Sequence, residues 1–316
     1  MKNSSKQGTA LVIGHGLIGT YLKPRIEKEL GLVVMQIAGE TLPDIVFVAI
    51  STRDTGEAAR DYILKYVQLG IPVVTCEKGS LAYHAEELMF YVASDMIGFD
   101  AACGGGSHIL SKARKHVLFI REFRANAVLN STLNFIGSRL EAGKTPDEAC
   151  EEAKAIGIVE PGSKNFAEMI RGEIHDVLMK TCVFYNTVFL TAFSITPDMF
   201  DTAPLTSEGI DQLITLLRSG YRMVISFDDF PNKRQYFSEG TFKLTTADFH
   251  HIQGGFCDIS NESTDFRSWF PQGIENGILV VEAGKVTLEV KGLGARPQPT
   301  TDAMIADARK LLGRSL

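Results

Sequence analysis

The chain has 316 residues, of which 45% are hydrophobic and 22% are charged, a composition typical of a soluble globular protein with room for two domains. Its formal net charge of −6 gives no electrostatic basis for binding nucleic acid or an anionic membrane surface. No apolar run is long enough to span a bilayer, and the polar N-terminus leads directly into the first predicted strand, so we expect no signal peptide.

The cysteines indicate the expected compartment. They are odd in number, lie far apart in the chain, and show no C-x-x-C spacing. We therefore expect free thiols and a reducing, cytoplasmic location. The five residues are Cys76, Cys103, Cys150, Cys182 and Cys257.

A glycine motif near the N-terminus is the first functional signal. Residues 10–13 form a short apolar run that predicts a buried strand, and residues 20–30 can continue as a helix. Between them, Gly14, Gly16 and Gly19 have the G-x-G-x-x-G spacing of a dinucleotide site. In such a site the glycines permit a tight turn, close approach of a pyrophosphate, and close packing of helix on strand. The alternative is a glycine turn in an ordinary strand–helix unit.

The following residues predict a parallel sheet. Short apolar strands are expected at 32–38, 44–50 and 72–75, with a helix at 56–69. Few residues separate the first two of these strands, so we expect the usual crossover helix to be missing there.

Three polar side chains follow the ends of these strands. Ser51 and Thr52 come after one strand, and Lys78 after the next. The carboxyl ends of parallel strands border the crevice in which ligands bind, so we expect all three residues to face that crevice. For Lys78 the alternative is a solvated surface lysine.

Beyond residue 98 the pattern changes to helices on a mixed or antiparallel sheet. The expected strands are 117–124, 222–227, 242–246 and 278–290, the last a hairpin turned at 282–285. The expected helices are 131–141, 146–157, 166–190, 207–219 and 300–313.

The longest predicted helix, 166–190, carries charges beside its apolar stripe. Asp176 and Lys180 are spaced i, i+4, and Glu173 lies three residues before Asp176, so all three share one face. Partial burial would let the lysine exchange a proton near neutral pH. A surface salt bridge would give the same sequence pattern.

A glycine-rich loop follows Asp100. That carboxylate and the carbonyls of residues 103–107 could surround a hard monovalent cation, and a flexible glycine loop is the alternative. His250 and His251, near Cys257 and Asp258, do not have metal-ligand spacing.

Seven segments stand in a characteristic order. They are Gly14–Gly19, Val73–Ala82 with Lys78, Asp100–Gly106, Asn130–Asn134, Gly157–Pro161, Asp176–Lys180, and Gly292–Ala295 with Thr300-Thr301. In this order they resemble the motifs of the homoserine dehydrogenase family over nearly the whole chain.

The resemblance implies a Rossmann-type dinucleotide-binding domain, residues 1–98 with 293–316, and an α+β catalytic and dimerisation domain, residues 99–292. It further implies NAD- or NADP-dependent interconversion of L-aspartate 4-semialdehyde and L-homoserine, in the biosynthesis of threonine and methionine. A cytoplasmic homodimer is expected, with no C-terminal regulatory module.

The resemblance also implies roles for single residues. Lys78 and Lys180 would lie at the reacting oxygen, with Lys180 as proton donor. Asp176 would orient the substrate amine or a water, and Glu160 would bind the amino group. A structural sodium ion would be held by Asp100 and the carbonyls of Cys103, Gly105 and Ser107. The expected cofactor-binding residues are Gly14, Gly16, Leu17, Ile18, Gly19, Glu40, Ser51, Thr52, Lys78 and Gly294.

Glu40 bears on the cofactor. It lies near the end of the second predicted strand, where an acid binds a ribose hydroxyl and repels a 2′-phosphate, which slightly favours NAD.

The chain departs from the family pattern mainly on the substrate side. The segment 161–175 is longer and lacks an expected carboxylate, for which Glu168 or Glu173 could substitute. His108 stands where the family tends to have proline, and Ser131 where it has glycine. One alternative is therefore the same hydride transfer on another amino-acid semialdehyde or small carbonyl compound. Another is a non-catalytic NAD(P)-binding sensor, against which the retention of both lysines argues.

Overall fold

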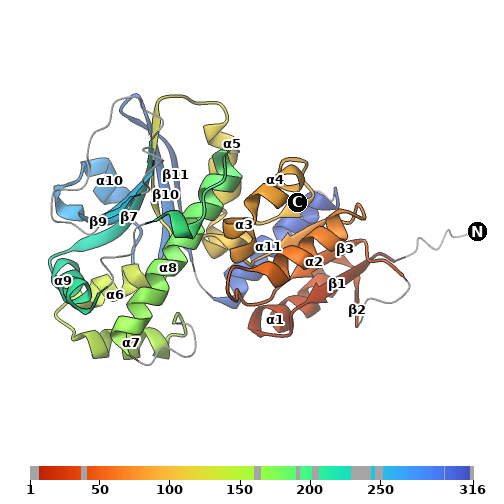
Figure 1. Ribbon diagram of the computed structural model, residues 1–316, viewed down its shortest axis with the longest axis horizontal. Coiled ribbons are helices and arrows are strands. Elements are labelled where there is room, and N and C mark those ends of the chain that lie inside the picture. The colour runs from red at the N-terminus through yellow and green to blue at the C-terminus, as the bar shows by residue number, and fades with distance from the viewer. Residues whose placement is uncertain are drawn as a thin grey trace, which may run out of the picture.

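Two β-sheets with helices on their faces make up the structure, a computed structural model (Figure 1). It describes residues 7–36, 41–159, 165–189, 193–200, 206–228, 243–245, 252–294 and 296–313, with the backbone alone at 243–245. Among these residues, no helix combines the length and apolar character needed to cross a membrane.

The first sheet is parallel, as predicted. Its strands are β1 (Thr9–Ile13), β2 (Val33–Met35), β3 (Ile45–Val48), β4 (Val73–Thr75) and β5 (Ile97–Gly98), in the order β2-β1-β3-β4-β5. The order reverses between β1 and β3, which makes their carboxyl ends the switch point at which open α/β sheets bind ligands. The described residues between β2 and β3, 36 and 41–44, contain no helical turn.

Helices cover both faces of this sheet. On one face lie α1 (Leu17–Arg25), a π-helical turn η1 (Ile26–Leu30), and the C-terminal helix α11 (Pro297–Leu311). On the other lie α2 (Glu57–Val67), α3 (Gly79–Tyr83) and α4 (Ala85–Ala93). Successive residues of β3 point to opposite faces of the sheet. Phe47 packs in the hydrophobic cluster with α1 and α11, whereas Val46 and Val48 pack in the cluster with α2.

An ion pair fixes the C-terminal helix to the first helix. Arg25 at the end of α1 contacts Glu29 at 2.7 Å and Asp302 of α11 at 2.6 Å, and it also donates to the Thr301 hydroxyl. The last described helix thus packs on the same sheet as the first.

The second sheet is antiparallel throughout its described strands. These are β6 (Phe123–Val128), β7 (Tyr221–Asp228), β8 (Lys243–Thr245), β9 (Ile252–Asp258), β10 (Glu275–Glu282) and β11 (Lys285–Leu293), in the order β11-β10-β6-β7-β9-β8. The predicted hairpin is confirmed: Ala283 and Gly284 both have positive φ, 48° and 79°, as a tight two-residue hairpin turn requires.

The remaining helices pack around this sheet. They are α5 (Ile109–Val117), α6 (Ser131–Glu141), α7 (Pro146–Ala155), α8 (Phe166–Phe184) with a π-helical turn η4 (Tyr185–Phe189), α9 (Ser207–Arg218) and α10 (Thr264–Trp269). Short 3-10 turns are η2 (Asp100–Ala102), η3 (Gly105–Ser107), η5 (Pro197–Met199) and η6 (Ile259–Asn261). The long helix α8 runs from α7 up toward α3 and the first sheet (Figure 1).

One predicted element is wrong. The apolar run 117–120 suggested a strand from 117 to 124, but Val117 ends α5 and the strand begins only at Phe123. Ile109, Ala113 and Val117 recur at helical spacing and are buried, whereas Leu118 and Phe119 are exposed. Hydrophobicity alone did not distinguish a helix end from a strand start.

The glycine turn after β1 generates a stability prediction. Gly14 has a φ of 120°, and a Cβ there would overlap the carbonyl oxygen of Ala49. We expect Gly14→Ala to lower the free energy of unfolding by about 2 kcal/mol or more, measured by urea denaturation. Gly143 is the control, because its φ of 87° carries strain but a Cβ there would have no other atom within 4 Å. Equal losses for Gly14→Ala and Gly143→Ala would show that the contact with Ala49 is unimportant.

Candidate functional site

Two lysines from different parts of the chain share one carboxylate. Lys78 precedes α3 just beyond β4, while Asp176 and Lys180 are one turn apart on α8. The Lys78 ammonium pairs with Oδ1 of Asp176, and the Lys180 ammonium lies 2.7 Å from Oδ2. The three side chains are only 13–18% exposed. The structure thus brings together the three residues predicted to be catalytic.

The lysines determine the charge of Asp176. Burial alone would raise the pKa of this carboxyl, but the ammonium groups of Lys180 and Lys78 outweigh burial and hold the pKa well below its ordinary range. Asp176 is therefore ionised at neutral pH, and each of its oxygens faces one ammonium group.

A second acid on the same helix behaves in the opposite way. Burial, and then the charge of Asp176, raise the pKa of Glu173 to about 7. The Asn130 amide donates to Glu173 at 2.7 Å and to Asp176 at 2.9 Å. Near neutral pH Glu173 can therefore hold or release a proton, and its ionised form would attract a cationic group.

Asn130 was not among the predicted site residues, although it lies in one of the family-like segments. Its side-chain oxygen accepts the Leu133 N–H at 2.7 Å and so caps α6, while its amide nitrogen binds the two acids of α8. An asparagine directly before a predicted helix is a capping signal, and this signal could have found the residue.

A buried glutamate positions Lys78. Glu77 accepts hydrogen bonds from the backbone N–H groups of Gly79 at 2.7 Å and Ser80 at 2.8 Å, and from the Thr52 hydroxyl at 2.6 Å. It thereby satisfies the free N–H groups at the start of α3 and ties the β3 and β4 loops together. Glu77 was not among the predicted site residues. Thr52 was predicted to bind the cofactor, but its hydrogen bond to Glu77 was not predicted.

The glycine turn is open where a ligand would approach. A Cβ at Gly19 would overlap the Gly14 carbonyl, so those two glycines serve packing, whereas a Cβ at Gly16 would have no other atom within 4 Å. Gly16 and Leu17 are exposed, and Ile18 is half-buried. No side chain caps the N-terminus of α1. These features fit a pyrophosphate, which is bound by free helix N–H groups and needs a close backbone approach.

The other predicted cofactor residues differ in their surroundings. Ser51 is exposed just beyond β3. Gly294 lies at the end of β11, where a Cβ would overlap the Asn276 side chain. Glu40 and Glu160 lie outside the described residues.

The loop predicted to hold sodium is already engaged with protein donors. Asp100 accepts from the Ser111 N–H at 2.9 Å, the Ser111 hydroxyl at 2.6 Å and the His108 ring at 2.8 Å. The Ser107 carbonyl accepts from the Lys112 ammonium at 3.3 Å. Across the described part of the chain, no group of three or more His, Cys, Asp or Glu side chains is arranged to hold a metal ion. Two of the four predicted ligands, Asp100 and Ser107, are thus engaged by donors of the chain, and this arrangement does not fit a cation bound at those two oxygens.

These features define a class of protein: a parallel α/β sheet with a dinucleotide-type glycine turn, beside a cluster in which Lys78, beyond that sheet, meets Asp176 and Lys180 of α8. No model of a protein family matches the chain. A curated homoserine dehydrogenase of Pyrococcus horikoshii is 37% identical over 93 residues, 29% of this chain and 29% of that protein. One from Lactococcus lactis is 24% identical over 266 residues, 82% of this chain and 55% of that protein. The chain spans about half or less of the length of these curated relatives.

Solved structures share the fold. The homoserine dehydrogenase of Thermoplasma acidophilum has a TM-score of 0.67 at 15% identity, covering 98% of this chain and 100% of that one. A hyperthermophilic archaeal homoserine dehydrogenase in complex with NADPH has a TM-score of 0.66 at 17% identity, covering 97% and 98%. The chain is thus similar to homoserine dehydrogenases in sequence and in fold, which confirms the resemblance seen in its motifs.

The shared carboxylate generates a second prediction. We expect Asp176→Asn to lower the free energy of unfolding by about 3–5 kcal/mol, because it removes the negative charge that two largely buried ammonium groups share. Removing one ammonium as well, in Asp176→Asn with Lys180→Met, should recover part of the loss in urea denaturation. Asp95→Asn is the control, since its ion pair with Lys310 is exposed and its loss costs about 1 kcal/mol or less. Equal losses for Asp176→Asn and Asp95→Asn would contradict the interpretation.

Proposed function

We propose that the chain is an NAD- or NADP-dependent homoserine dehydrogenase that interconverts L-aspartate 4-semialdehyde and L-homoserine. The observation that carries the proposal is the convergence of Lys78 and Lys180 on Asp176, beside the carboxyl end of β4. Two similar proteins support the cofactor class: a curated one from Pseudomonas canavaninivorans, 27% identical over 146 residues, is an NAD(+)-dependent homoserine dehydrogenase, and the hyperthermophilic archaeal structure is a complex with NADPH.

The glycine turn and the lysine cluster have separate tasks. Gly16 and the start of α1 would hold the pyrophosphate, and the bound nicotinamide would supply or accept the hydride. Lys180 gives a proton to the carbonyl oxygen of the semialdehyde, and takes it back from the hydroxyl in the reverse direction. Lys78 stabilises the charge that develops on this oxygen, and Asp176 holds both ammonium groups in place.

Glu173 is the acid that we assign to the amino group of the substrate. It lies on the face of α8 that carries Asp176, and Asn130 holds its carboxylate. Glu168, the other candidate, is exposed in the first turn of α8. The ammonium of the substrate stabilises ionised Glu173, so binding couples to loss of its proton. Glu160 remains a candidate for the same task.

The organisation of the chain follows from the same proposal. Residues 1–98 with 293–316 bind the dinucleotide, and residues 99–292 provide catalysis and the contact in a homodimer. This division is supported by the packing of α11 on the first sheet and by the exposed outer strand β11 of the second. We also propose that the protein acts in the cytoplasm.

A substrate panel with matched variants tests the function. Purified protein should reduce NAD⁺ or NADP⁺ with L-homoserine, measured by the absorbance of the reduced nicotinamide. Lys180→Ala should lower kcat by about 10²–10⁴-fold, as expected for loss of a positioned proton donor, while cofactor affinity stays nearly unchanged. Lys28→Ala, which removes the same charge from an exposed position on η1, should leave kcat unaltered.

Each other outcome of this panel has a defined meaning. Turnover of a different amino alcohol, with none of homoserine, would refute the assigned substrate and favour another amino-acid semialdehyde. Tight cofactor binding without any turnover would favour a sensor. Loss of cofactor binding in Lys180→Ala would show that Lys180 belongs to the cofactor site.

Glu173 generates a pH prediction. Because its pKa is raised to about 7, the carboxyl is protonated below that pH and must ionise to bind an ammonium group. We expect KM for homoserine to fall as the pH rises from about 6 to 8, over the range set by this pKa. Glu173→Gln should abolish this dependence and raise KM, whereas Glu168→Gln on the same helix should not.

The stability of the free protein provides an independent readout. A folded-state pKa above the ordinary value means that the bound proton stabilises the fold, and this contribution is lost as pH rises through about 7. Glu173→Gln should therefore be relatively more stable than the wild type above pH 7.

A wild-type pH profile for KM that persists in Glu173→Gln would assign the titration to another group.

A further inference from the structure

The loop 99–108 is wedged between the two sheets. It leads from β5 of the first sheet to α5, which packs beside the second. A Cβ at Gly105 would come within 2.9 Å of the Gly294 carbonyl, and one at Gly106 within 2.8 Å of Pro299. The loop therefore touches both the end of β11 and the start of α11, and it has no room for larger residues there.

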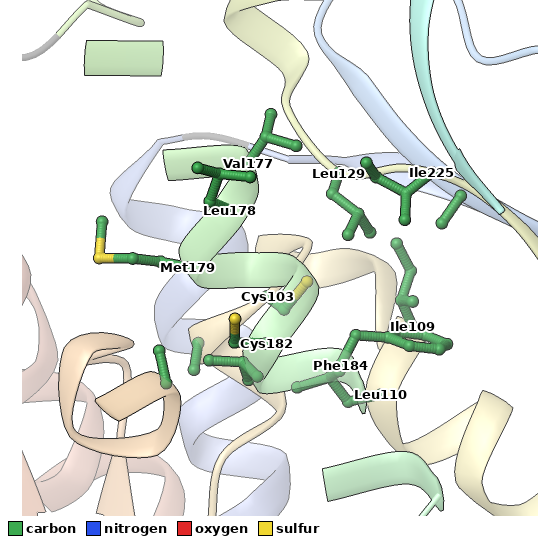
Figure 2. Packing of buried hydrophobic residues seen from close by; sticks show 14 of the residues in the cluster. Cys103, Ile109, Leu110, Leu129, Val177, Leu178, Met179, Cys182, Phe184 and Ile225 are labelled. Carbon is green, nitrogen blue, oxygen red and sulfur yellow. The ribbon is translucent and has the colours of Figure 1, made fainter. Parts of the chain in front are cut away.

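The same loop lies close to the lysine cluster. Cys103 is fully buried, with its pKa raised to about 12 chiefly by that burial, and its thiol is within electrostatic reach of Lys180 and Asp176. Figure 2 shows Cys103 beside α8, among the buried side chains around Met179 and Cys182. The position of the loop thus bears on the position of the helix that carries the site.

Protein donors engage both oxygens of the buried carboxylate in this loop. The buried carboxylate of Asp100 accepts three hydrogen bonds, two from Ser111 and one from the ring of His108. The Ser107 carbonyl, in the adjacent turn η3, receives the Lys112 ammonium. These are two of the oxygens that a hard cation in this loop would need.

A second acid faces the same centre from α11. Asp307 accepts the backbone N–H of Asp100 at 2.9 Å, and Lys310 on the same helix pairs with Asp95. Two carboxylates this close require a positive partner or a shared proton. The cationic groups of this centre are His108, which faces both acids, Lys310, which faces Asp307, and Lys112, which lies near His108.

The backbone at His108 points to a role for its ring. The residue has a φ of 56°, in the left-handed region that favours glycine or asparagine. Histidine is strained there relative to glycine, but its ring gains the bond to Asp100.

We propose that the side chains of His108 and Lys112 take the place of a bound monovalent cation at Asp100 and Ser107, so that this junction loop is held without an ion. This role is independent of the substrate and of turnover. It neutralises the buried Asp100 carboxylate with groups of the chain itself.

The test removes the ring and supplies the ion. Wild type and His108→Gly are melted in NaCl, KCl and choline chloride at equal ionic strength, since glycine suits the left-handed backbone. The wild-type Tm should be the same in all three salts. In choline chloride His108→Gly should melt about 3–8 °C lower, the size of shift expected for loss of one or two stabilising contacts, and Na⁺ or K⁺ should restore most of the difference.

A control variant distinguishes loss of the hydrogen-bond donor from the change of backbone residue. His108→Asn tolerates the same φ and retains a side-chain donor, so its Tm should not depend on the salt. The sodium NMR linewidth should broaden with His108→Gly and not with the wild type. A wild-type Tm that is higher in NaCl or KCl than in choline chloride overturns the proposal, as does a His108→Gly variant that gains nothing from either ion. If His108→Gly does not fold, the wild-type comparison and Lys112→Met, which frees the Ser107 carbonyl, decide by the same criteria.

Discussion

The Asp176 carboxylate is the interaction on which the site depends. Each of its oxygens faces one ammonium group, so Lys78 of the first sheet and Lys180 of α8 are held at one point. A carboxylate this buried is stable in its ionised form only with such partners, and its charge offsets the repulsion between the two ammonium groups that it brings together. A single carboxylate therefore holds both lysines of the site and also joins α8 to the loop that follows β4.

Close backbone approach is what allows this contact. Gly14 lies against Ala49 at the switch point, and Gly56 against the start of α3, at positions where a Cβ would collide with backbone atoms. Glu77 then binds the first N–H groups of α3 and the Thr52 hydroxyl, so that Lys78 projects toward α8. The lysine is positioned by backbone geometry and by a buried acid, and its side chain reaches the Asp176 carboxylate.

The sequence predicted the periodic elements and the polar groups that one helix brings together. The start of α7 followed from its capping box and the start and course of the long helix α8 from apolar spacing, and Asp176 with Lys180 followed from the i, i+4 rule. The bonds of Asn130 to the acids of α8 and of Thr52 to Glu77 could not be predicted in this way, because the partners are 25 to 46 residues apart in the chain. The strand expected at 117–124 failed for a related reason, since only tertiary burial distinguishes the end of α5 from the start of β6.

Two pairs of acids, in each of which the two pKa values shift in opposite directions, include an acid within electrostatic reach of Cys103. On one side Asp176 is ionised between two ammonium groups, while the pKa of Glu173 is raised to about 7. On the other, the pKa of Asp100 is lowered by its donors despite burial, while that of Asp307 is raised to about 7. In each pair the carboxylate nearest the cations ionises first, and its charge then suppresses ionisation of the second. For the substrate this has a direct consequence: the acid that we assign to its amino group lies on a helix, where it is positioned more rigidly than on a loop, and the arriving ammonium group favours its ionised form.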